Sequence, residues 1–464
     1  MKIIDIHTKL LDVLQLIEGA PYKTVYVTDN GKLVGSVTDG DVRRALVKYQ
    51  SLDVSAEKIM NPSPTYRDHN GHVINKKKAG VDIKVLPLLN EEGLIVDEGL
   101  VSEKYLPIAE PLLDYNEFNL LDEAYKSSWI SSRGYFIDKF ENDFSYMHGI
   151  KNGVTCANGT AALFLALSAI GLNSKEEVIV PTLTFGAVAN AVILAGGNPV
   201  FVDCEQERPI MDVKQILDAL SPNTKAVIVV HSYGYVVDIE KLRNALPVNI
   251  FIIEDCAEAH FAKLKHRLVG TLSDISCFSF FANKILTTGE GGICLTDNTE
   301  LASKMRILRD HGMSPLKRYW HLEVGFNLRL TNLQAAIGVA QLNRISSILE
   351  ERKQSECIWT EFLQRLGFGQ SLIPTRKNEE RGLWLFNVRL ELAEKKFLVD
   401  KLKTVSLETR DFFYCLHKMP PFKNFKCLKS NNAEIWEKHG LSLPVYSDSI
   451  NNRILRMRLE RCIS

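Results

Sequence analysis

The sequence lacks the features typical of proteins that bind nucleic acid or associate with membranes. Its 464 residues include 56 Lys and Arg and 56 Asp and Glu, so the formal net charge is zero. A chain with this balance has no general attraction for nucleic acid or for an anionic membrane surface. No apolar run in it approaches the roughly 20 residues that a membrane helix needs. We therefore expect neither nucleic acid nor a membrane among its main partners.

Features of secreted proteins are also missing. The nine cysteines are scattered and none belongs to a C-x-x-C pair, which favours free thiols in a reducing compartment over a disulfide framework or a metal site. The apolar pattern at the start of the chain is interrupted by Asp5, Asp12 and Glu18. Such a segment is not expected to be a signal peptide. We expect a cytoplasmic protein without a metal.

The length and composition indicate a globular protein of more than one domain. Hydrophobic residues make up 45% and charged residues 24%, which is ordinary for globular proteins, and the chain is too long for a single core. The patterns described below predict domains at residues 1–105, 106–344 and 345–464.

Residues 1–105 are predicted to form a small α+β module. Residues 23–35 read as a strand, an Asn-Gly turn and a second strand, which is a hairpin signal. Residues 84–99 look like a second copy, and residues 35–47 read as a strand, a turn and a helix. A repeated supersecondary unit suggests a pseudo-symmetric pair. The module resembles a CBS-domain pair, which often binds adenine nucleotides.

That resemblance implies that Thr38 and Asp41 hold the ribose of an adenine nucleotide. The same two residues are also common helix caps, so a purely structural role is the alternative. The second copy lacks the T-D-G-D element of the first, and no nucleotide contact is expected there. The module either binds a nucleotide and modulates activity, or supports oligomeric assembly.

From residue 106 the pattern changes to alternating strands and helices, an α/β arrangement. Continuous runs of Val and Ile predict strands buried on both faces, and hence a mostly parallel sheet. These runs lie at residues 176–182, 199–203, 224–234, 250–259 and 275–281. Ligands of such sheets bind at the carboxyl ends of the strands. Polar residues are concentrated at or just beyond those ends: Asp203, His231, Asp255 and Lys284.

A helix with small polar residues at its start is predicted within residues 155–171. Asn158 could be its N-cap, and Gly159 and Thr160 would then offer backbone N–H groups and a hydroxyl to a phosphate. Most helices that begin in this way bind nothing, so the segment needs support from other residues.

Lys284 and Asp255 provide that support. A lysine among apolar residues such as Phe280 and Ile285 has a lowered pKa, which frees its amine for Schiff-base chemistry. A carboxylate at the end of a buried strand needs a cationic or hydrogen-bonding partner. Asp255 could be a capping residue, or it could pair with a protonated ring nitrogen. Together with the phosphate cradle, these residues predict a pyridoxal 5′-phosphate site.

Residues 106–464 resemble the sugar aminotransferases of the DegT/DnrJ/EryC1/StrS family. The resemblance implies the fold type I architecture of pyridoxal phosphate enzymes, with a small C-terminal α+β domain. The matching stretches are residues 127–144, 156–167, 180–203, 253–260, 279–292 and 325–342.

The resemblance also implies roles for residues around the cofactor. Lys284 would form the Schiff base and move the proton, Asp255 would pair with the pyridine nitrogen, and Glu258 would lie near the ring oxygen. Phe185 would stack on the ring, although a phenylalanine by itself is more often a core residue. The phosphate would be held by Gly159, Thr160 and Ser279, and across a dimer interface by Asn327.

Residues on the substrate side are implied as well. They are His231, Arg329 and His417, of which His417 could equally be a packing or surface residue. The substrates would be L-glutamate and a nucleotide-linked keto sugar, and the shared site would require a homodimer.

The implied reaction is the transfer of the glutamate amino group to C4 of a nucleotide-linked 4-keto-6-deoxy sugar. Residues 312–336 look most like the GDP-perosamine synthases, which implies GDP-4-keto-6-deoxy-mannose as the acceptor and a role in surface polysaccharide biosynthesis. Alternatives are a UDP- or dTDP-linked sugar, or a non-catalytic regulatory protein. The related 3-dehydratases carry histidine where Lys284 stands, so dehydration is not expected.

The sequence departs from the family pattern in two loops. Residues 233–238 lack a proline that is usual there, and Phe261 and His266 stand where glycines are usual. Glycine often supplies a positive φ at such turns, so the loop after Asp255 is expected to be reshaped.

Overall fold

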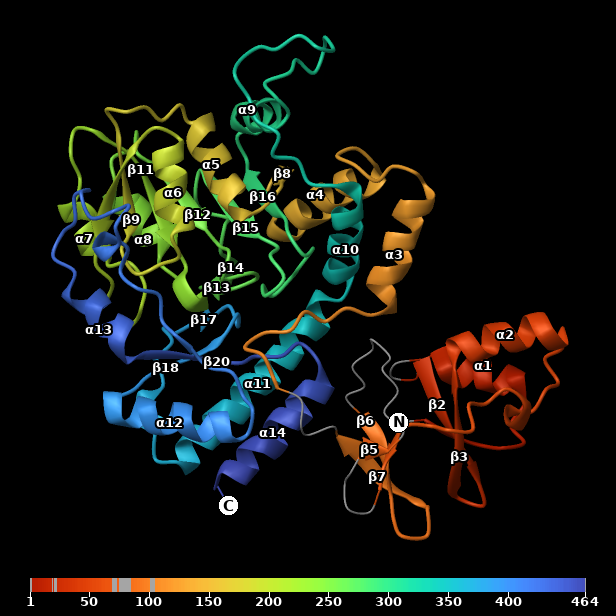
Figure 1. Ribbon diagram of the computed structural model, residues 1–464. Coiled ribbons are helices and arrows are strands. Elements are labelled where there is room, and N and C mark those ends of the chain that lie inside the picture. The colour runs from red at the N-terminus through yellow and green to blue at the C-terminus, as the bar shows by residue number, and fades with distance from the viewer. Residues whose placement is uncertain are drawn as a thin grey trace. The chain divides into compact units, whose positions relative to one another are not determined.

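The computed structural model describes residues 2–18, 20, 23–68, 73–74, 85–100 and 105–463. The chain divides into two units, Met1–Lys104 and Tyr105–Ser464 (Figure 1). Within the described residues, no helix combines the length and the apolar character needed to cross a membrane.

The N-terminal unit is built around two antiparallel hairpins. The first sheet has the order β1-β2-β3, with β1 at Ile3–Asp5, β2 at Thr24–Asp29 and β3 at Lys32–Thr38. Helices α1 (Leu10–Glu18) and α2 (Asp39–Tyr49) and the short helix η2 (Ala56–Lys58) accompany it. The first hairpin turns at Asn30 and Gly31, both with positive φ, as the Asn-Gly signal predicts.

The second hairpin corresponds to the predicted second copy, whose first residue, Lys84, lies outside the described residues. It consists of β6 (Val85–Leu89) and β7 (Ile95–Leu100) and belongs to a sheet of order β5-β4-β6-β7, with β4 at Tyr66–Arg67 and β5 at Val73–Ile74. The two hairpins are joined by a hydrogen bond of 3.1 Å from the Leu33 N–H to the Gly93 carbonyl.

The larger unit contains a seven-stranded sheet of order β10-β9-β11-β12-β15-β16-β8. The strands are β8 (Asn152–Cys156), β9 (Glu177–Pro181), β10 (Asn198–Val202), β11 (Thr224–Val230), β12 (Phe251–Asp255), β15 (Ile275–Ser279) and β16 (Gly292–Thr296). Pairs involving β16 are antiparallel, and the other pairs are parallel. The predicted mostly parallel α/β sheet is confirmed.

Successive strand residues enter two different cores, as the alternation of side chains along a strand requires. Ile252 packs in the core that contains helices α4 and α10, whereas Ile253 packs in the core under α5 and α6. The helices of this part are α3 (Tyr115–Lys126), α4 (Tyr135–His148), α5 (Gly159–Ala169), α6 (Ala187–Leu194), α7 (Val213–Asp218), α8 (Ile239–Ala245), α9 (Thr299–Arg309) and α10 (Asn332–Asn343), with the short helix η3 at Ser232–Gly234.

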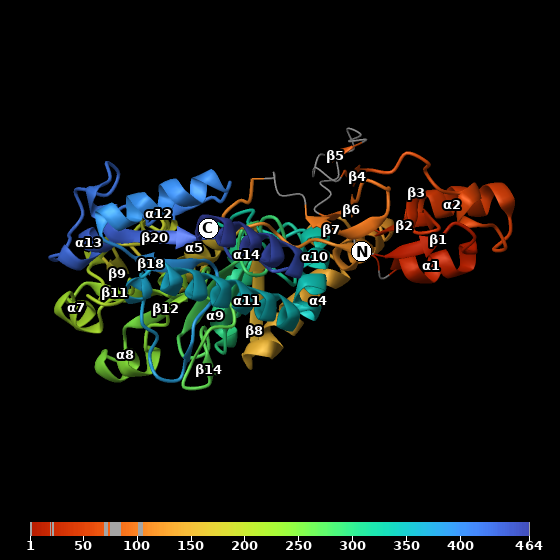
Figure 2. The ribbon, with the colours of Figure 1, turned by 90° about the horizontal axis from the view of Figure 1, so that it is seen from below.

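The C-terminal part packs a small sheet against helices. Figure 2 shows α11 (Ile345–Arg365) beside α14 (Ser449–Ile463). The other elements are η4 (Gly369–Ser371), β17 (Glu379–Glu380), β18 (Phe386–Arg389), α12 (Leu392–Thr404), β19 (Arg410–Asp411), η5 (Leu416–Lys418), α13 (Asn431–His439) and β20 (Gly440–Leu443). Arg344 lies between α10 and α11, where the sequence predicts the small domain to begin.

A second small sheet connects the loop after β12 to the C-terminal part. Strands β13 (Lys263–Leu264) and β14 (Arg267–Leu268) form a hairpin, and β13 also pairs with β17. The turn residues Lys265 and His266 have φ values of 52° and 66°, and Phe261 has a φ of 59°. The reshaping of this loop relative to other family members stays a prediction. Phe261 and His266 adopt the left-handed backbone that glycine favours.

Candidate active site

Lys284 follows β15, and its amine lies in a largely buried cluster that includes Glu258 and Trp384, called the pocket below. Its side chain is 13% exposed, and Nζ lies 3.9 Å from Glu258 Oε1. The Trp384 ring centre is 4.2 Å from the same nitrogen. Burial lowers the pKa of Lys284, while the carboxylates of Glu258 and Asp255 partly oppose that change. The amine is therefore easier to deprotonate than an exposed lysine, as an amine nucleophile requires.

Two carboxyl groups face this amine. Asp255 is the last residue of β12, and its Oδ1 accepts the Ala257 N–H at 3.0 Å. Burial raises the pKa of Asp255, although the Ala257 N–H and the charge of Lys284 lower it. Glu258 accepts the Tyr233 N–H at 2.7 Å through Oε2, and burial raises the pKa of Glu258 to about 7.

The start of α5 and the end of β15 form a narrow cradle. Asn158 is the predicted N-cap, and its side chain accepts the Ala161 N–H at 2.9 Å. A Cβ on Gly159 would lie 2.6 Å from the Cβ of Ser279, so only glycine allows this approach. Thr160 is half-buried on the next position of the helix. Helix N-termini present unpaired N–H groups that suit an anion such as phosphate.

These residues fit pyridoxal 5′-phosphate. Gly159 packs so closely against Ser279 that the methyl group of an alanine at this position would clash with it, and this leaves the helix N-terminus uncovered by a side chain of residue 159. Lys284 offers an amine of lowered pKa, and Asp255 offers a buried carboxyl group that needs a cationic partner. The structure thus places the lysine near two buried carboxyl groups, and it packs a helix N-terminus suited to an anion against the end of β15, the strand that the lysine follows. These are the kinds of groups that pyridoxal phosphate requires.

Phe185 and His417 lie in segments that meet near the end of β9. Phe185 is 62% exposed, so the core alternative for this residue is wrong. Its ring centre is 6.0 Å from that of Phe413. His417 Nδ1 contacts Thr182 Oγ1 at 2.6 Å. The histidine therefore joins the C-terminal part to the loop that carries Phe185, which is a packing contact.

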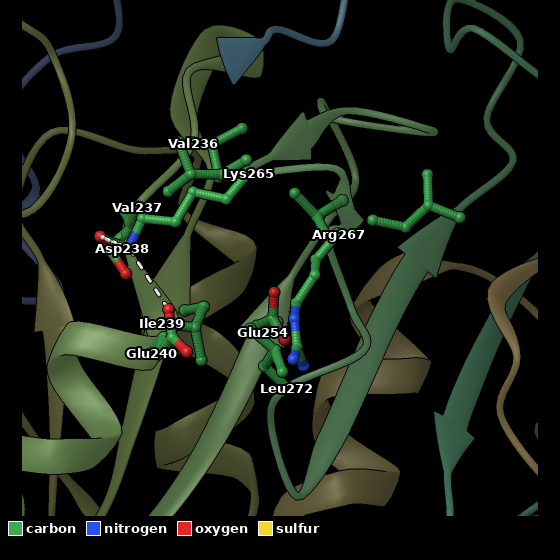
Figure 3. A pocket seen from close by; sticks show the side chains of 12 residues that line it. Val236, Val237, Asp238, Ile239, Glu240, Glu254, Lys265, Arg267 and Leu272 are labelled. Atoms are coloured by element: carbon green, nitrogen blue, oxygen red, sulfur yellow. Dashed lines mark hydrogen bonds and ion pairs between the residues drawn. The ribbon is translucent and has the colours of Figure 1, made fainter. Parts of the chain in front are cut away.

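His231 is enclosed within the protein and its ring is not accessible to solvent. Its Nε2 is 2.8 Å from Glu254 Oε2, and Nδ1 accepts the Val237 N–H at 3.2 Å. The predicted substrate role is corrected, since both ring nitrogens are used inside the protein. Glu254 also lines a cavity of about 30 Å³ (Figure 3). That cavity lies across β12 from Asp255, because successive strand residues face opposite sides.

Asn327 and Arg329 lie on the surface. Arg329 donates to Asp310 Oδ1 at 2.7 Å and to Asn327 Oδ1 at 3.1 Å. They follow the long loop that leaves the body of the unit after α9 (Figure 1), which exposes Leu316, Tyr319, Trp320, Leu322 and Val324. The structure therefore exposes Asn327 and leaves Arg329 partly buried, next to an exposed apolar loop.

Thr38 and Asp41 form a capping box at the start of α2. The Thr38 hydroxyl donates to Asp41 Oδ2 at 2.6 Å, and the Thr38 N–H donates to the same oxygen at 2.8 Å. These contacts show the structural role considered above, a helix cap. The contact with a nucleotide stays a prediction.

Trp384 is a residue of the pocket that sequence reasoning missed. It belongs to an aromatic group with Tyr233 and Phe413, whose ring centres are 5.4 Å apart. Its local sequence, G-L-W-L-F, reads as an ordinary buried strand. No local pattern signals its contact with Lys284, because the two residues meet only through the packing of the C-terminal part.

Comparisons with known families agree with this geometry. The model of the DegT/DnrJ/EryC1/StrS aminotransferase family matches residues 111–456. The CBS domain model matches residues 1–48, which contain the first of the two predicted copies.

Two curated relatives are similar along most of their length. A GDP-perosamine synthase of Caulobacter vibrioides is 39% identical over 346 residues, covering 74% of this chain and 93% of that protein. A GDP-perosamine synthase of Escherichia coli O157:H7 is 37% identical over 361 residues, covering 76% and 96%.

Solved structures share the fold. The protein DesV of S. venezuelae, solved in complex with a ketimine intermediate, superimposes with a TM-score of 0.68 at 28% identity, covering 76% of this chain and 98% of that one. The PLP form of a sugar aminotransferase of Streptococcus pneumoniae gives a TM-score of 0.70 at 22% identity, covering 78% and 100%. The predicted fold type I architecture is confirmed.

Proposed function

Because the chain belongs to the DegT/DnrJ/EryC1/StrS aminotransferase family and is a pyridoxal phosphate-dependent sugar aminotransferase, we propose that it converts GDP-4-keto-6-deoxy-mannose to GDP-perosamine with L-glutamate as donor. The observation that carries the proposal is the similarity to three GDP-perosamine synthases, at 37–39% identity over 69–76% of the chain. The product would serve surface polysaccharide biosynthesis.

A UDP-linked acceptor is the second candidate. A UDP-N-acetyl-3-dehydro-alpha-D-glucosamine 3-aminotransferase of Acidithiobacillus ferrooxidans is 40% identical, although over only 48% of this chain. The shorter coverage favours the GDP-linked sugar.

The roles of the pocket residues follow from their positions. Bound pyridoxal phosphate supplies a ring that stabilises negative charge on the reacting carbon. Lys284 Nζ would carry the cofactor and then hold the proton that leaves the α-carbon of glutamate. Its lowered pKa supports this role. Asp255 would hold the positive charge of the ring nitrogen, and Glu258 would lie beside the ring oxygen.

The remaining residues would bind and orient. Gly159, Thr160 and Ser279 would hold the phosphate group, and Phe185 would cover the ring. Asn327, which is exposed, and Arg329, which is partly buried, follow the long loop and would reach the pocket of a second copy. We therefore propose a homodimer whose two sites each need both chains, which is an isologous arrangement.

The experiment that tests the acceptor is a panel assay. The full-length protein with pyridoxal phosphate is incubated with glutamate and with GDP-, UDP- and dTDP-linked 4-keto-6-deoxy sugars, and products are identified by mass. An aminated GDP sugar is expected. A product from only the UDP- or dTDP-linked ketones would overturn the choice of acceptor and leave the reaction class standing.

A second experiment separates catalysis from a purely regulatory role. Borohydride reduction of the cofactor-loaded protein should attach the cofactor to Lys284, as peptide mass spectrometry would show. Failure to label this lysine would contradict its proposed role.

The N-terminal unit is proposed to bind an adenine nucleotide or to support assembly. Calorimetric titration of the full-length protein with AMP, ATP and GDP, compared with the Asp41→Ala variant, distinguishes the two. Heat from AMP or ATP that the variant loses supports binding, and no heat from any nucleotide supports assembly.

A further inference from the structure

Trp384 is the aromatic residue that faces the amine of Lys284. The centre of its ring lies 4.2 Å from Lys284 Nζ, a distance at which the electron-rich face of an indole attracts an ammonium group. The tryptophan is buried, with 6% of its surface exposed. Water therefore competes little for this contact, which strengthens it relative to the same contact on a surface.

Hydrogen bonds fix the tryptophan on two sides. Its Nε1–H donates to the carbonyl of Asn283 at 3.0 Å, and Asn283 is the residue before the lysine. Arg352, a buried residue of α11, donates to the carbonyls of Leu383 and Trp384, each at 2.6 Å. The ring is thus tied to the lysine's own loop, and its backbone is tied to the C-terminal part.

Close backbone packing holds the chain just before Trp384. The Gly382 N–H donates to the Gly234 carbonyl at 2.9 Å. A Cβ on Gly382 would lie 2.6 Å from the Ala259 Cα, and a Cβ on Gly234 would lie on the Gly382 carbonyl oxygen. Side chains at either glycine would push the segment, and with it the tryptophan, away from the pocket.

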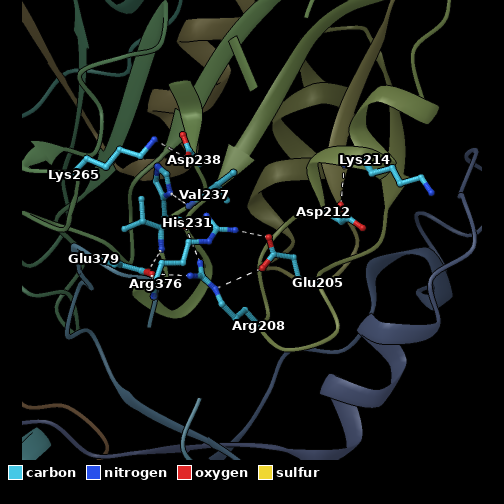
Figure 4. Close-up of polar contacts among 11 residues, drawn as sticks. Glu205, Arg208, Asp212, Lys214, His231, Val237, Asp238, Lys265, Arg376 and Glu379 are labelled. Carbon is cyan, nitrogen blue, oxygen red and sulfur yellow. Dashed lines mark hydrogen bonds and ion pairs between the residues drawn. The ribbon is translucent and has the colours of Figure 1, made fainter. Parts of the chain in front are cut away.

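An ion-pair network anchors the same segment a few residues earlier (Figure 4). Glu379 accepts hydrogen bonds from Arg208 Nη1 at 2.7 Å and from the Val236 N–H at 2.8 Å. Arg376 forms an ion pair with Glu205. Because Arg208 and Glu379 are buried, breaking their pair would leave an uncompensated charge. The position of the segment is therefore strongly specified.

The charged and titratable groups around the amine come from β12 and the loop after it. They are Asp255 and Glu258, with His260 behind them. Burial lowers the pKa of His260 to about 3, so this ring is neutral at ordinary pH. From the C-terminal part, the Trp384 ring contacts the amine. This ring attracts a cation but does not accept a proton.

We propose that Trp384 is a positioning residue for Lys284, whose ring holds the ammonium form of the amine beside Glu258 when the amine is not joined to the cofactor. The inference rests on the proposed role of Lys284. It adds that the C-terminal part helps to set the affinity of this amine for a proton. Without the ring, the ammonium form loses a stabilising contact, whereas the neutral amine does not. The amine should therefore lose its proton at a lower pH.

The test measures the titration of Lys284 directly. Cofactor-free, full-length protein is labelled briefly with acetic anhydride across a pH series, and acetylation of Lys284 is quantified by peptide mass spectrometry. In the Trp384→Leu variant, the midpoint of the labelling rate against pH should fall by about one pH unit. Easier access of the reagent raises the rate at every pH but does not move the midpoint.

Further variants keep the test decisive. Trp384→Met should show the same fall and serves if the leucine variant does not fold. Trp384→Phe, which retains a ring, should show a smaller fall. Trp359→Phe is the matched control, because Trp359 is also buried and bonded through Nε1, in its case to the Pro444 carbonyl at 2.7 Å.

An unchanged midpoint in a folded Trp384→Leu or Trp384→Met variant would overturn the inference, whatever happened to activity. Borohydride labelling of the wild type would still report on Lys284 separately. Failure of the inference and failure of the proposed function therefore give different results.

Discussion

Lys284 Nζ and Glu258 Oε1 lie 3.9 Å apart in a pocket where both side chains are largely buried. Burial pushes each group toward its neutral form, lowering the pKa of the lysine and raising the pKa of Glu258 to about 7. Their attraction opposes this effect without cancelling it. The carboxyl group of Glu258 therefore changes its charge near neutral pH, and this titration should affect stability.

Glu258→Gln should become progressively more stable than the wild type as pH rises from about 5 to 8. The folded pKa of Glu258, about 7, is above its ordinary value of 4.5. The stability that the protonated carboxyl contributes is thus full below 4.5 and is lost as pH rises through 7. The relative change should be on the order of 1–3 kcal/mol, measured by urea unfolding. A difference that did not depend on pH would contradict the assignment. Glu434→Gln, in a half-exposed position, is the control.

Gly159→Ala should weaken cofactor binding about 10- to 100-fold, because its Cβ would lie 2.6 Å from that of Ser279 and overpacking costs about 1–3 kcal/mol. Binding is measured by the visible absorbance of pyridoxal phosphate during titration. Gly369→Ala is the matched control, since the nearest atom to its Cβ would be the Gln364 side chain at 3.7 Å. Equal affinity in the two variants would show that Gly159 does not form the phosphate site.

Mixing two inactive variants should restore activity if the site is shared. Lys284→Ala and Asn327→Ala are each expected to be strongly impaired. After unfolding and refolding together in equal amounts, half of the dimers would combine one chain of each kind and carry one intact site. The expected activity is about a quarter of the wild-type value. If both variants are impaired and the mixture recovers no activity, with dimers confirmed by light scattering, Asn327 belongs to the pocket of its own chain. An Asn327→Ala variant that is active by itself would place Asn327 outside any pocket.

His266→Gly should stabilise the protein by about 0.5–1 kcal/mol, because His266 is exposed at a φ of 66° and the left-handed conformation disfavours residues with a Cβ. His266→Ala retains the Cβ and should bring no such gain, so it is the control. Thermal unfolding measures both. If the alanine variant were as stable as the glycine variant, loss of the histidine side chain, and not backbone relief, would be the cause.

Those parts of the site that depend on local sequence pattern could be predicted from the sequence. Lys284 stands out as a charge among apolar residues, and Asp255 ends a run of buried strand residues. Asn158 and Gly159 begin a helix in a form that the structure reproduces. Strand and helix patterns predicted a parallel sheet, and strands of such a sheet deliver their last residues to one edge. The order of these residues along the chain therefore sufficed to predict a common site.

The same local reasoning failed for His231. Its place after a strand suggested a residue at the pocket, but the direction of a side chain alternates along a strand. The ring turns to the opposite side of β12, toward Glu254. Thr38 and Asp41 show a related limit, since one short motif suits both a ribose and a helix cap, and the observed hydrogen bonds belong to the cap.

By itself, then, the sequence determined the class of fold and the cofactor and singled out the lysine that we propose to react, because each depends on residues within one strand–loop–helix unit or on the order of such units. Only the tertiary structure decided what surrounds that lysine. Trp384 reaches it through the packing of Gly382 on Gly234, and Glu258 is held by the Tyr233 N–H. These contacts join segments far apart in the chain, and their geometry depends on how whole layers pack, which no local pattern encodes.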